Sequence, residues 1–215
     1  MSTITCEQLP ALFQGVADLF AEKKEELCEM DANMGDGDLG LTMDKGYGAL
    51  LGLLRENTEA DDAGKTLMKA GMKMSGVVPS TMGTLMSSGI MEGGKALKGK
   101  RELGPQELAV YLTAFAAGIQ KRGKCQLGDR TILDAVDPAA KAAEKAAAEG
   151  GDLAAVIAAA CEGAAQGVEA TKSMTPKFGK AAVFAAKAAG VPDQGAVAGM
   201  YMIQGLRRGL EALSG

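Results

Sequence analysis

Apolar residues recur at steps of three and four along most of the chain. Three clear series are Leu9, Leu12, Phe13, Val16, Leu19 and Phe20; Met43, Tyr47, Leu50, Leu51 and Leu54; and Leu108, Leu112, Phe115 and Ile119. This spacing places each series on one face of an α-helix. The Ala-rich stretches 139–149 and 153–170 also favour helix, because alanine has the highest helix propensity.

Turn-forming residues interrupt the helical pattern at intervals. The interruptions lie near residues 31–40, 57–63, 75–80, 98–105, 123–129, 150–152, 172–179 and 190–195. They leave about eight or nine helices without alternating β-branched runs, so the sequence predicts an all-α fold. None of them is long or polar enough for a domain linker, so we expect one domain over residues 1–215.

The composition excludes several classes of function. Histidine is absent from the 215 residues, which excludes a Ser-His-Asp triad, a His-ligated zinc site and a phosphohistidine carrier. The net charge of −4 provides no electrostatic footprint for nucleic acid or an anionic membrane surface, so we expect neither as a partner.

Cysteine usage and the N-terminus indicate the compartment. The four cysteines stand far apart without a CxxC pair, and the N-terminus lacks the basic and apolar regions of a signal peptide. No segment approaches the ~20 apolar residues of a membrane span. We therefore expect a cytoplasmic protein.

Glycine is unusually frequent, with 30 residues. A glycine inside a helix is less stable than alanine by up to ~1 kcal/mol, so its presence there suggests a close helix contact or a kink. The glycines within predicted helices are Gly46, Gly48, Gly52, Gly71, Gly83, Gly89, Gly118 and Gly199.

The sharpest chemical feature is the acidic turn at residues 31–40, where Asp31, Asp36 and Asp38 crowd together among three glycines. Such close carboxylates repel one another unless a cation lies among them, and Mg²⁺ or Ca²⁺ prefers oxygen ligands of this kind. The turn therefore predicts a carboxylate–metal site, with a solvated helix-cap cluster as the alternative. Its GxGxxG spacing does not follow a strand, and the turn lacks the EF-hand pattern.

Four later loops offer further candidate positions. Residues 75–84 place hydroxyls and free backbone N–H groups at a helix N-terminus, which could bind phosphate or could simply cap the helix. Gly123–Asp134 forms another loop that leads into a helix. Lys180 and Asp193–Gly195 lie in loops before the last helix.

Taken in order, five blocks resemble the L subunit of dihydroxyacetone kinase, its nucleotide-binding component. They are DANMGDGDLGLTM, the small-residue loop before MGT, RGKCQLGDRTILDAVDPA, KFGKAA and PDQGA. The resemblance covers nearly the whole chain. It implies a closed up-and-down barrel of about eight antiparallel helices, with a nucleotide held at one rim.

The resemblance also implies roles for individual residues. Asp31, Asp36 and Asp38 match carboxylates that chelate a pair of Mg²⁺ ions on the phosphates of ADP or ATP, and no side chain acts as a catalytic acid or base. The matching nucleotide-binding positions are Leu39, Thr42, Val77, Val78, Ser80, Thr81, Gly123, Ile132, Lys180, Asp193 and Gly195.

This sequence departs from the family pattern at several of these positions. Leu39 and Thr42 stand where the family usually has His and Asn, and Lys180 replaces Arg. Val77 and Val78 replace small polar residues of the phosphate loop.

The activity implied is phosphoryl transfer to a small ketose such as dihydroxyacetone, with the substrate held by a separate K subunit. In one version, bound ADP is rephosphorylated by an M subunit, and in the other, free ATP exchanges. A homodimer is also compatible with the sequence. The alternatives are a kinase for another small ketose or polyol and a nucleotide-sensing regulatory module without turnover.

Overall fold

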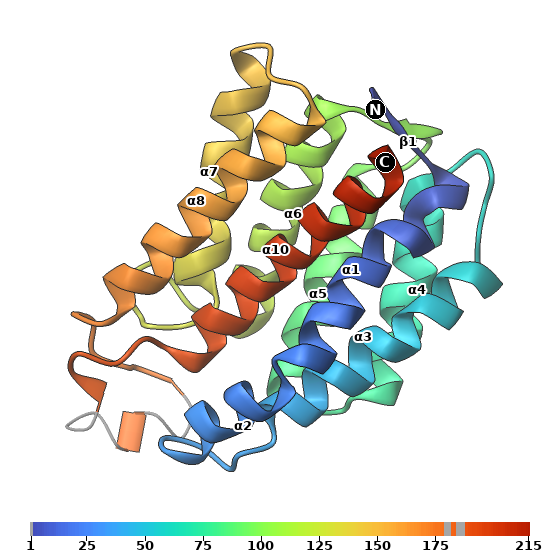
Figure 1. The fold of residues 1–215 in the computed structure, drawn as a ribbon. Coiled ribbons are helices and arrows are strands. Elements are labelled where there is room, and N and C mark those ends of the chain that lie inside the picture. Colours follow the sequence, from blue (N-terminus) through green and yellow to red (C-terminus); the bar gives the residue numbers. More distant parts are fainter. Residues whose placement is uncertain (1, 179–181, 184–187) are drawn as a thin grey trace.

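The computed structural model describes residues 2–178, 182–183 and 188–215, and most of these are helical (Figure 1). The α-helices are α1 (Leu9–Glu22), α2 (Lys24–Ala32), α3 (Leu39–Glu56), α4 (Ala63–Val77), α5 (Thr81–Ala96), α6 (Pro105–Gly123), α7 (Leu133–Ala148), α8 (Leu153–Thr171) and α10 (Gln194–Ser214). A 3-10 helix, η1 (Cys6–Gln8), precedes α1. The predicted all-α fold is confirmed.

Two short strands pair the N-terminal segment with the loop between α5 and α6. Strand β1 (Ile4–Thr5) pairs antiparallel with β2 (Glu102–Leu103), with Ile4 opposite Leu103. The sequence pattern does not predict this pair, because two residues are too few to show an alternation of apolar and polar positions.

The long helices form a closed barrel. Each packs on the next in the order α1, α3, α4, α5, α6, α7, α8 and α10, and α10 returns to pack on α1 (Figure 1). The chain reverses at each connection, so neighbouring helices are antiparallel. The N-termini of α3, α5, α7 and α10 consequently meet at one end of the barrel, where the short helix α2 also lies.

Aromatic side chains fill part of the barrel interior. The Phe20 and Tyr47 rings lie 4.9 Å apart between centroids, and Phe13 meets Tyr111 edge-on at 6.4 Å. All four residues are buried. The periodic apolar positions of the sequence are therefore the core positions of the barrel.

Glycines allow several helix pairs to approach closely. The α1–α10 contact that closes the barrel is among the tightest, because a Cβ atom at Gly209 would lie 1.9 Å from the backbone oxygen of Leu12. Close contacts are confirmed at Gly46, Gly71, Gly83, Gly89, Gly118 and Gly199. Gly48 and Gly52 do not mark a close helix contact, because no atom of the described residues comes within 4 Å of such a Cβ.

Helix boundaries differ from the predicted ones at two places that shape the barrel end. The first helical stretch divides at Lys23 into α1 and α2, so Asp31 belongs to the last turn of α2 instead of the following turn. The loop before α7 extends to residue 132, because Arg130 adopts a left-handed backbone conformation with a φ of 60°.

Among the described helices, α8 has the length and hydropathy of a membrane span, contrary to the expectation for this sequence. Half of its apolar stretch is buried within the protein. This part of its apolar surface is therefore used in packing against the neighbouring helices.

Candidate functional site

A cavity of about 540 Å³ opens at the barrel end where the four helix N-termini meet. Most of the residues singled out in the sequence lie on its wall: Asp31, Asp36, Asp38, Leu39, Thr42, Ser80, Thr81, Ile132, Asp193 and Gly195. They come from four regions far apart in the sequence, at residues 31–42, 80–81, 132 and 193–195. The antiparallel order of the helices brings them together, because alternate helices begin at the same end.

The acidic turn forms one corner of the cavity. One carboxylate oxygen from each of Asp31, Asp36 and Asp38 lies within 4.8 Å of the other two. Asp31 is buried, whereas Asp36 and Asp38 are exposed. This all-oxygen donor set, with two of its members open to solvent, fits a Mg²⁺ ion that keeps several of its waters.

Asp31 also organises the turn that carries the other two carboxylates. Its Oδ2 atom accepts hydrogen bonds from the backbone N–H groups of Gly37, at 2.9 Å, and Asp38, at 3.1 Å. A Cβ atom at Gly35 would lie 2.3 Å from Asp31 Oδ1, so a side chain at that position would displace the carboxylate. The glycines of the turn thus allow the backbone to fold tightly around Asp31.

Helix N-termini form a second part of the cavity wall. The first turns of α3, α5 and α10, together with residues 131–132 before α7, all line the cavity. Helix N-termini carry partial positive charge and unsatisfied N–H groups, which bind anions such as phosphate. The cavity therefore combines carboxylates of the kind that bind a cation with helix N-termini of the kind that bind an anion.

Ser80 and Asp193 both line the cavity and cap their helices. Ser80 Oγ accepts from Gly83 N–H at 3.0 Å at the start of α5, and Asp193 Oδ2 accepts from Ala196 N–H at 2.8 Å at the start of α10. The capping alternative for the Ser80 loop is therefore observed, and it is compatible with a role on the cavity wall.

Apolar side chains make up a third part of the wall. Met82, Leu85, Ile132 and Phe178 line the cavity together with Pro79. The Phe178 side chain is partly exposed, at 43%. Its neighbour Lys177 holds this segment in place through an ion pair of 2.6 Å with Asp129 and a backbone hydrogen bond from Lys177 N–H to Asp129 O at 3.2 Å.

Two carboxyl groups near the cavity have shifted pKa values, in opposite directions. The Lys177 ammonium group, followed by the Gln126 N–H, lowers the pKa of Asp129. Burial raises the pKa of Asp193 from 3.8 to about 6, although the Ala196 N–H and Arg130 act in the opposite direction. Asp193 therefore titrates closer to neutrality than an exposed aspartate does.

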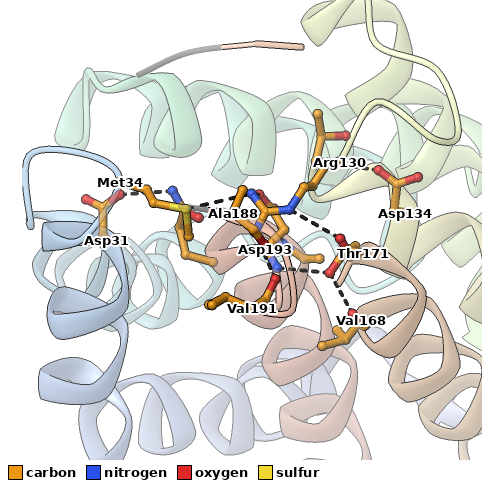
Figure 2. A network of polar contacts seen from close by, with 12 residues as sticks. Asp31, Met34, Arg130, Asp134, Val168, Thr171, Ala188, Val191 and Asp193 are labelled. Atoms are coloured by element: carbon orange, nitrogen blue, oxygen red, sulfur yellow. Dashed lines mark hydrogen bonds and ion pairs between the residues drawn. The ribbon is translucent and has the colours of Figure 1, made fainter. Parts of the chain in front are cut away.

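A buried polar network lies beside the cavity and centres on Arg130 (Figure 2). Its guanidinium group is completely buried and contacts the end of α8, residues 188–193 and the acidic turn. Arg130, Gln194 and Met34 line the cavity but were not predicted as site residues. The GDRT motif marks Arg130 in the sequence, but its burial depends on contacts between distant segments that periodicity does not reveal.

The other predicted nucleotide-binding positions do not line the cavity. Val78 is buried, and its side chain packs where a Cβ at Gly46 or Gly83 would lie, while Val77 is half-buried against the core. Gly123 lies behind Leu85, whose Cδ2 would be 3.2 Å from a Cβ there. Lys180 lies outside the described residues.

Comparisons with known proteins agree with the resemblance seen in the sequence. The DAK2 domain matches residues 33–208. The chain is 26% identical over 187 residues to the "PEP-dependent dihydroxyacetone kinase, ADP-binding subunit DhaL" of Escherichia coli, covering 87% of this chain and 89% of that protein. It is 34% identical over 128 residues to a Listeria innocua protein named as the same subunit of a second such kinase, covering 59% of each.

Longer relatives and solved structures share the same region. The mouse triokinase/FMN cyclase is 28% identical over 195 residues, which cover 91% of this chain but 33% of the relative. The crystal structure of the dihydroxyacetone kinase of C. freundii has a TM-score of 0.69 at 22% identity, covering 93% of this chain and 34% of that chain. The structure of that kinase with AMP-PNP and Mg²⁺ gives a TM-score of 0.67. Since the family match extends over most of the sequence, this chain belongs to the DAK2 domain family.

Proposed function

We propose that this chain is the nucleotide-binding subunit of a dihydroxyacetone-type kinase and transfers a phosphoryl group to a small ketose held by a second polypeptide. One observation carries the proposal: three carboxylates within 4.8 Å of one another share a cavity with four helix N-termini. Phosphoryl transfer needs metal and anion sites side by side, because the transferred group is stabilised mainly by positioning and electrostatics.

The three parts of the cavity wall suggest how a nucleotide would lie. Asp31, Asp36 and Asp38 would hold Mg²⁺, as a pair of ions by family resemblance, which would neutralise charge on the phosphates. Ser80, Thr81 and the N–H groups of the helix N-termini would bind phosphate oxygens. The apolar wall around Leu85, Ile132 and Phe178 would receive the base and exclude water.

A partner polypeptide would supply the sugar site. The longer relatives are about three times the length of the aligned region, so other parts of those proteins carry further functions. We therefore propose a K-type partner that binds the ketose. The E. coli relative is named PEP-dependent and ADP-binding, which favours a bound ADP that an M-type subunit rephosphorylates over an exchangeable ATP.

Calorimetric titration with ADP in the presence of Mg²⁺ tests the nucleotide site. We expect binding by the wild-type chain and a loss of at least about tenfold in affinity for Asp36→Ala, since a charged ligand to the metal is removed. Asp61→Ala is the matched control, because Asp61 is an exposed aspartate in the α3–α4 loop and does not line the cavity. No binding at millimolar ADP, or equal affinity in Asp36→Ala, would refute the proposal.

A second candidate function is nucleotide sensing without turnover. It is favoured by Leu39 in place of the family's histidine and by Val78, which is packed into the core away from the cavity. Reconstitution with candidate K and M subunits separates the two functions. Phosphorylation of dihydroxyacetone supports the kinase, whereas nucleotide binding without any ketose phosphorylation supports the sensor.

A further inference from the structure

We propose that Arg130 is a positioning residue that couples the N-terminus of α10 to the acidic turn, and so holds Asp31 in place for the metal and the phosphates. The metal-related part of this inference rests on the proposed function. The coupling itself concerns only the contacts between residues of this chain.

Arg130 joins three separate segments from a fully buried position. Its contacts are Nε to Thr171 O at 3.2 Å, Nη2 to Ala188 O at 3.3 Å and Val191 O at 2.9 Å, and Nη1 to Met34 Sδ at 3.8 Å and Asp193 Oδ1 at 3.9 Å. Figure 2 shows the guanidinium group between these partners. The end of α8, residues 188–193 and the α2–α3 turn therefore all meet at this one side chain.

The backbone conformation at Arg130 and the hydrogen bonds of Asp134 hold the Arg130 side chain in this buried position. Arg130 has a φ of 60°, in the left-handed region that few residues other than glycine adopt. The Asp134 carboxylate holds the residues on either side of it, since Oδ1 accepts from Gly128 N–H at 2.6 Å and Oδ2 from Thr131 N–H at 2.7 Å. A strained conformation that the surrounding contacts maintain in this way is typical of functional sites.

Two routes lead from Arg130 to the metal-binding corner. The first is the direct contact with Met34, a buried residue of the acidic turn that also packs on Ala188. The second passes through the start of α10, where Asp193 pairs with Arg130 and the next residue, Gln194, donates from Nε2 to Asp31 Oδ1 at 3.4 Å. Met34, Arg130 and Gln194 all line the cavity, so both routes run along its wall.

The contacts require arginine and not just a positive charge. The guanidinium group has five N–H donors in a rigid plane, whereas lysine has a single ammonium group. Arg130 uses its three nitrogen atoms toward acceptors on different segments. A lysine would keep the charge beside Asp193 but could not bridge the same segments, so Arg130→Lys removes the coupling selectively.

Hydrogen exchange without nucleotide tests the coupling directly. In Arg130→Lys we expect exchange to rise by about tenfold or more in peptides covering residues 31–38 and 188–196, and to stay unchanged at the α1–α10 contact. Arg207→Lys is the matched control, because Arg207 is exposed and pairs with Glu211 on the same helix. Unchanged exchange at residues 31–38, or a uniform rise through the whole chain, would overturn the proposal.

A double-mutant cycle in Mg²⁺–ADP binding tests the route through α10. The cycle combines Arg130→Lys with Gln194→Met, which removes the contact with Asp31. Each of these two single variants should weaken binding by about tenfold. The double variant should lose less than the product of the two losses, because both substitutions break one route. Independent, multiplying effects would contradict this route.

Both tests keep the two proposals distinguishable. If the wild-type chain fails to bind ADP, the proposed function fails, and hydrogen exchange still decides the coupling. If Arg130→Lys does not fold, Gln194→Met serves alone: it should raise exchange at residues 31–38 and leave residues 188–191 unchanged. Equal exchange at residues 31–38 in that variant and the wild type would overturn the proposal.

Discussion

Asp193 and Arg130 form an ion pair in the protein interior, with 3.9 Å between Asp193 Oδ1 and Arg130 Nη1. The same carboxylate caps α10 through the Ala196 N–H. Desolvation of Asp193 outweighs both interactions, and its pKa rises from 3.8 to about 6. One residue therefore links the start of the last helix, the Arg130 network and a pH-dependent charge.

The raised pKa of Asp193 predicts a definite pH dependence of stability. Well below the ordinary pKa of 3.8, the carboxyl group is protonated in both the folded and unfolded states. As the pH rises through 4 to 6, the unfolded chain releases this proton first, so the folded state loses stability. With about 1.4 kcal/mol per pKa unit, the loss amounts to roughly 3 kcal/mol and is complete above pH 6.

Comparison with Asp193→Asn isolates this contribution, because the other titrating groups are common to both proteins. Urea unfolding at pH 4, 5, 6 and 7 should show the wild type losing free energy of unfolding relative to the variant as pH increases. Asparagine is also a good helix N-cap, so the cap itself is retained. If the free energy of unfolding of the wild type instead increased relative to that of Asp193→Asn as the pH rises, the pKa of Asp193 would be lowered by Arg130 and the prediction would be wrong.

Two glycine substitutions should change stability in opposite directions. Gly209→Ala places a methyl group against the Leu12 backbone oxygen at the contact that closes the barrel, so we expect a loss of about 1–3 kcal/mol or more. Gly48→Ala lies on the exposed face of α3 with open space around it, and should add up to about 1 kcal/mol through helix propensity.

Thermal and urea unfolding of the two variants measures both effects. They serve as controls for each other, since the chemical change is identical and only the surroundings differ. A stable Gly209→Ala protein with an unchanged unfolding midpoint would show that the α1–α10 contact adjusts easily.

The sequence predicts what is local and leaves open what depends on distant contacts. Helical periodicity identifies the core residues and the all-α class, whereas the closed barrel is implied by the family resemblance. The crowding of Asp31, Asp36 and Asp38 identifies the acidic corner without any tertiary information. The role of Arg130 could not be predicted in this way, because its partners at residues 34, 171, 188 and 191 come from separate segments. Likewise, Val78 has the polarity of a core residue, but only the packing at Gly46 and Gly83 shows that it faces away from the cavity.

Substitutions of Ser80 should separate capping from phosphate binding. Ser80→Ala removes the cap of α5 and should lower the free energy of unfolding by about 1 kcal/mol. Ser80→Asp retains a good N-cap but places a negative charge on the cavity wall. We therefore expect Ser80→Asp to be the more stable variant and the weaker binder of ADP.

Urea unfolding measures the stability of the two Ser80 variants, and calorimetry measures their affinity for ADP. The order of the two variants should be opposite in the two measurements. Equal ADP affinity in Ser80→Asp and the wild type would place the phosphates away from the start of α5. A Ser80→Ala protein as stable as the wild type would show that water or a neighbouring group replaces the cap.

Phe178 should distinguish the base end of the cavity from its phosphate end. It lines the apolar wall while remaining 43% exposed, as expected for a side chain that a flat ligand could cover. Stacking of a base on an aromatic ring contributes about 1–3 kcal/mol, so Phe178→Ala should weaken Mg²⁺–ADP binding by roughly 5- to 150-fold. Mg²⁺–pyrophosphate, which has no base, should bind both proteins equally. Val110→Ala, an exposed residue on α6 away from the cavity, controls for the loss of apolar surface. An equal loss for ADP and pyrophosphate would contradict the proposed orientation, because Phe178 would then act on the phosphates or on the shape of the whole cavity.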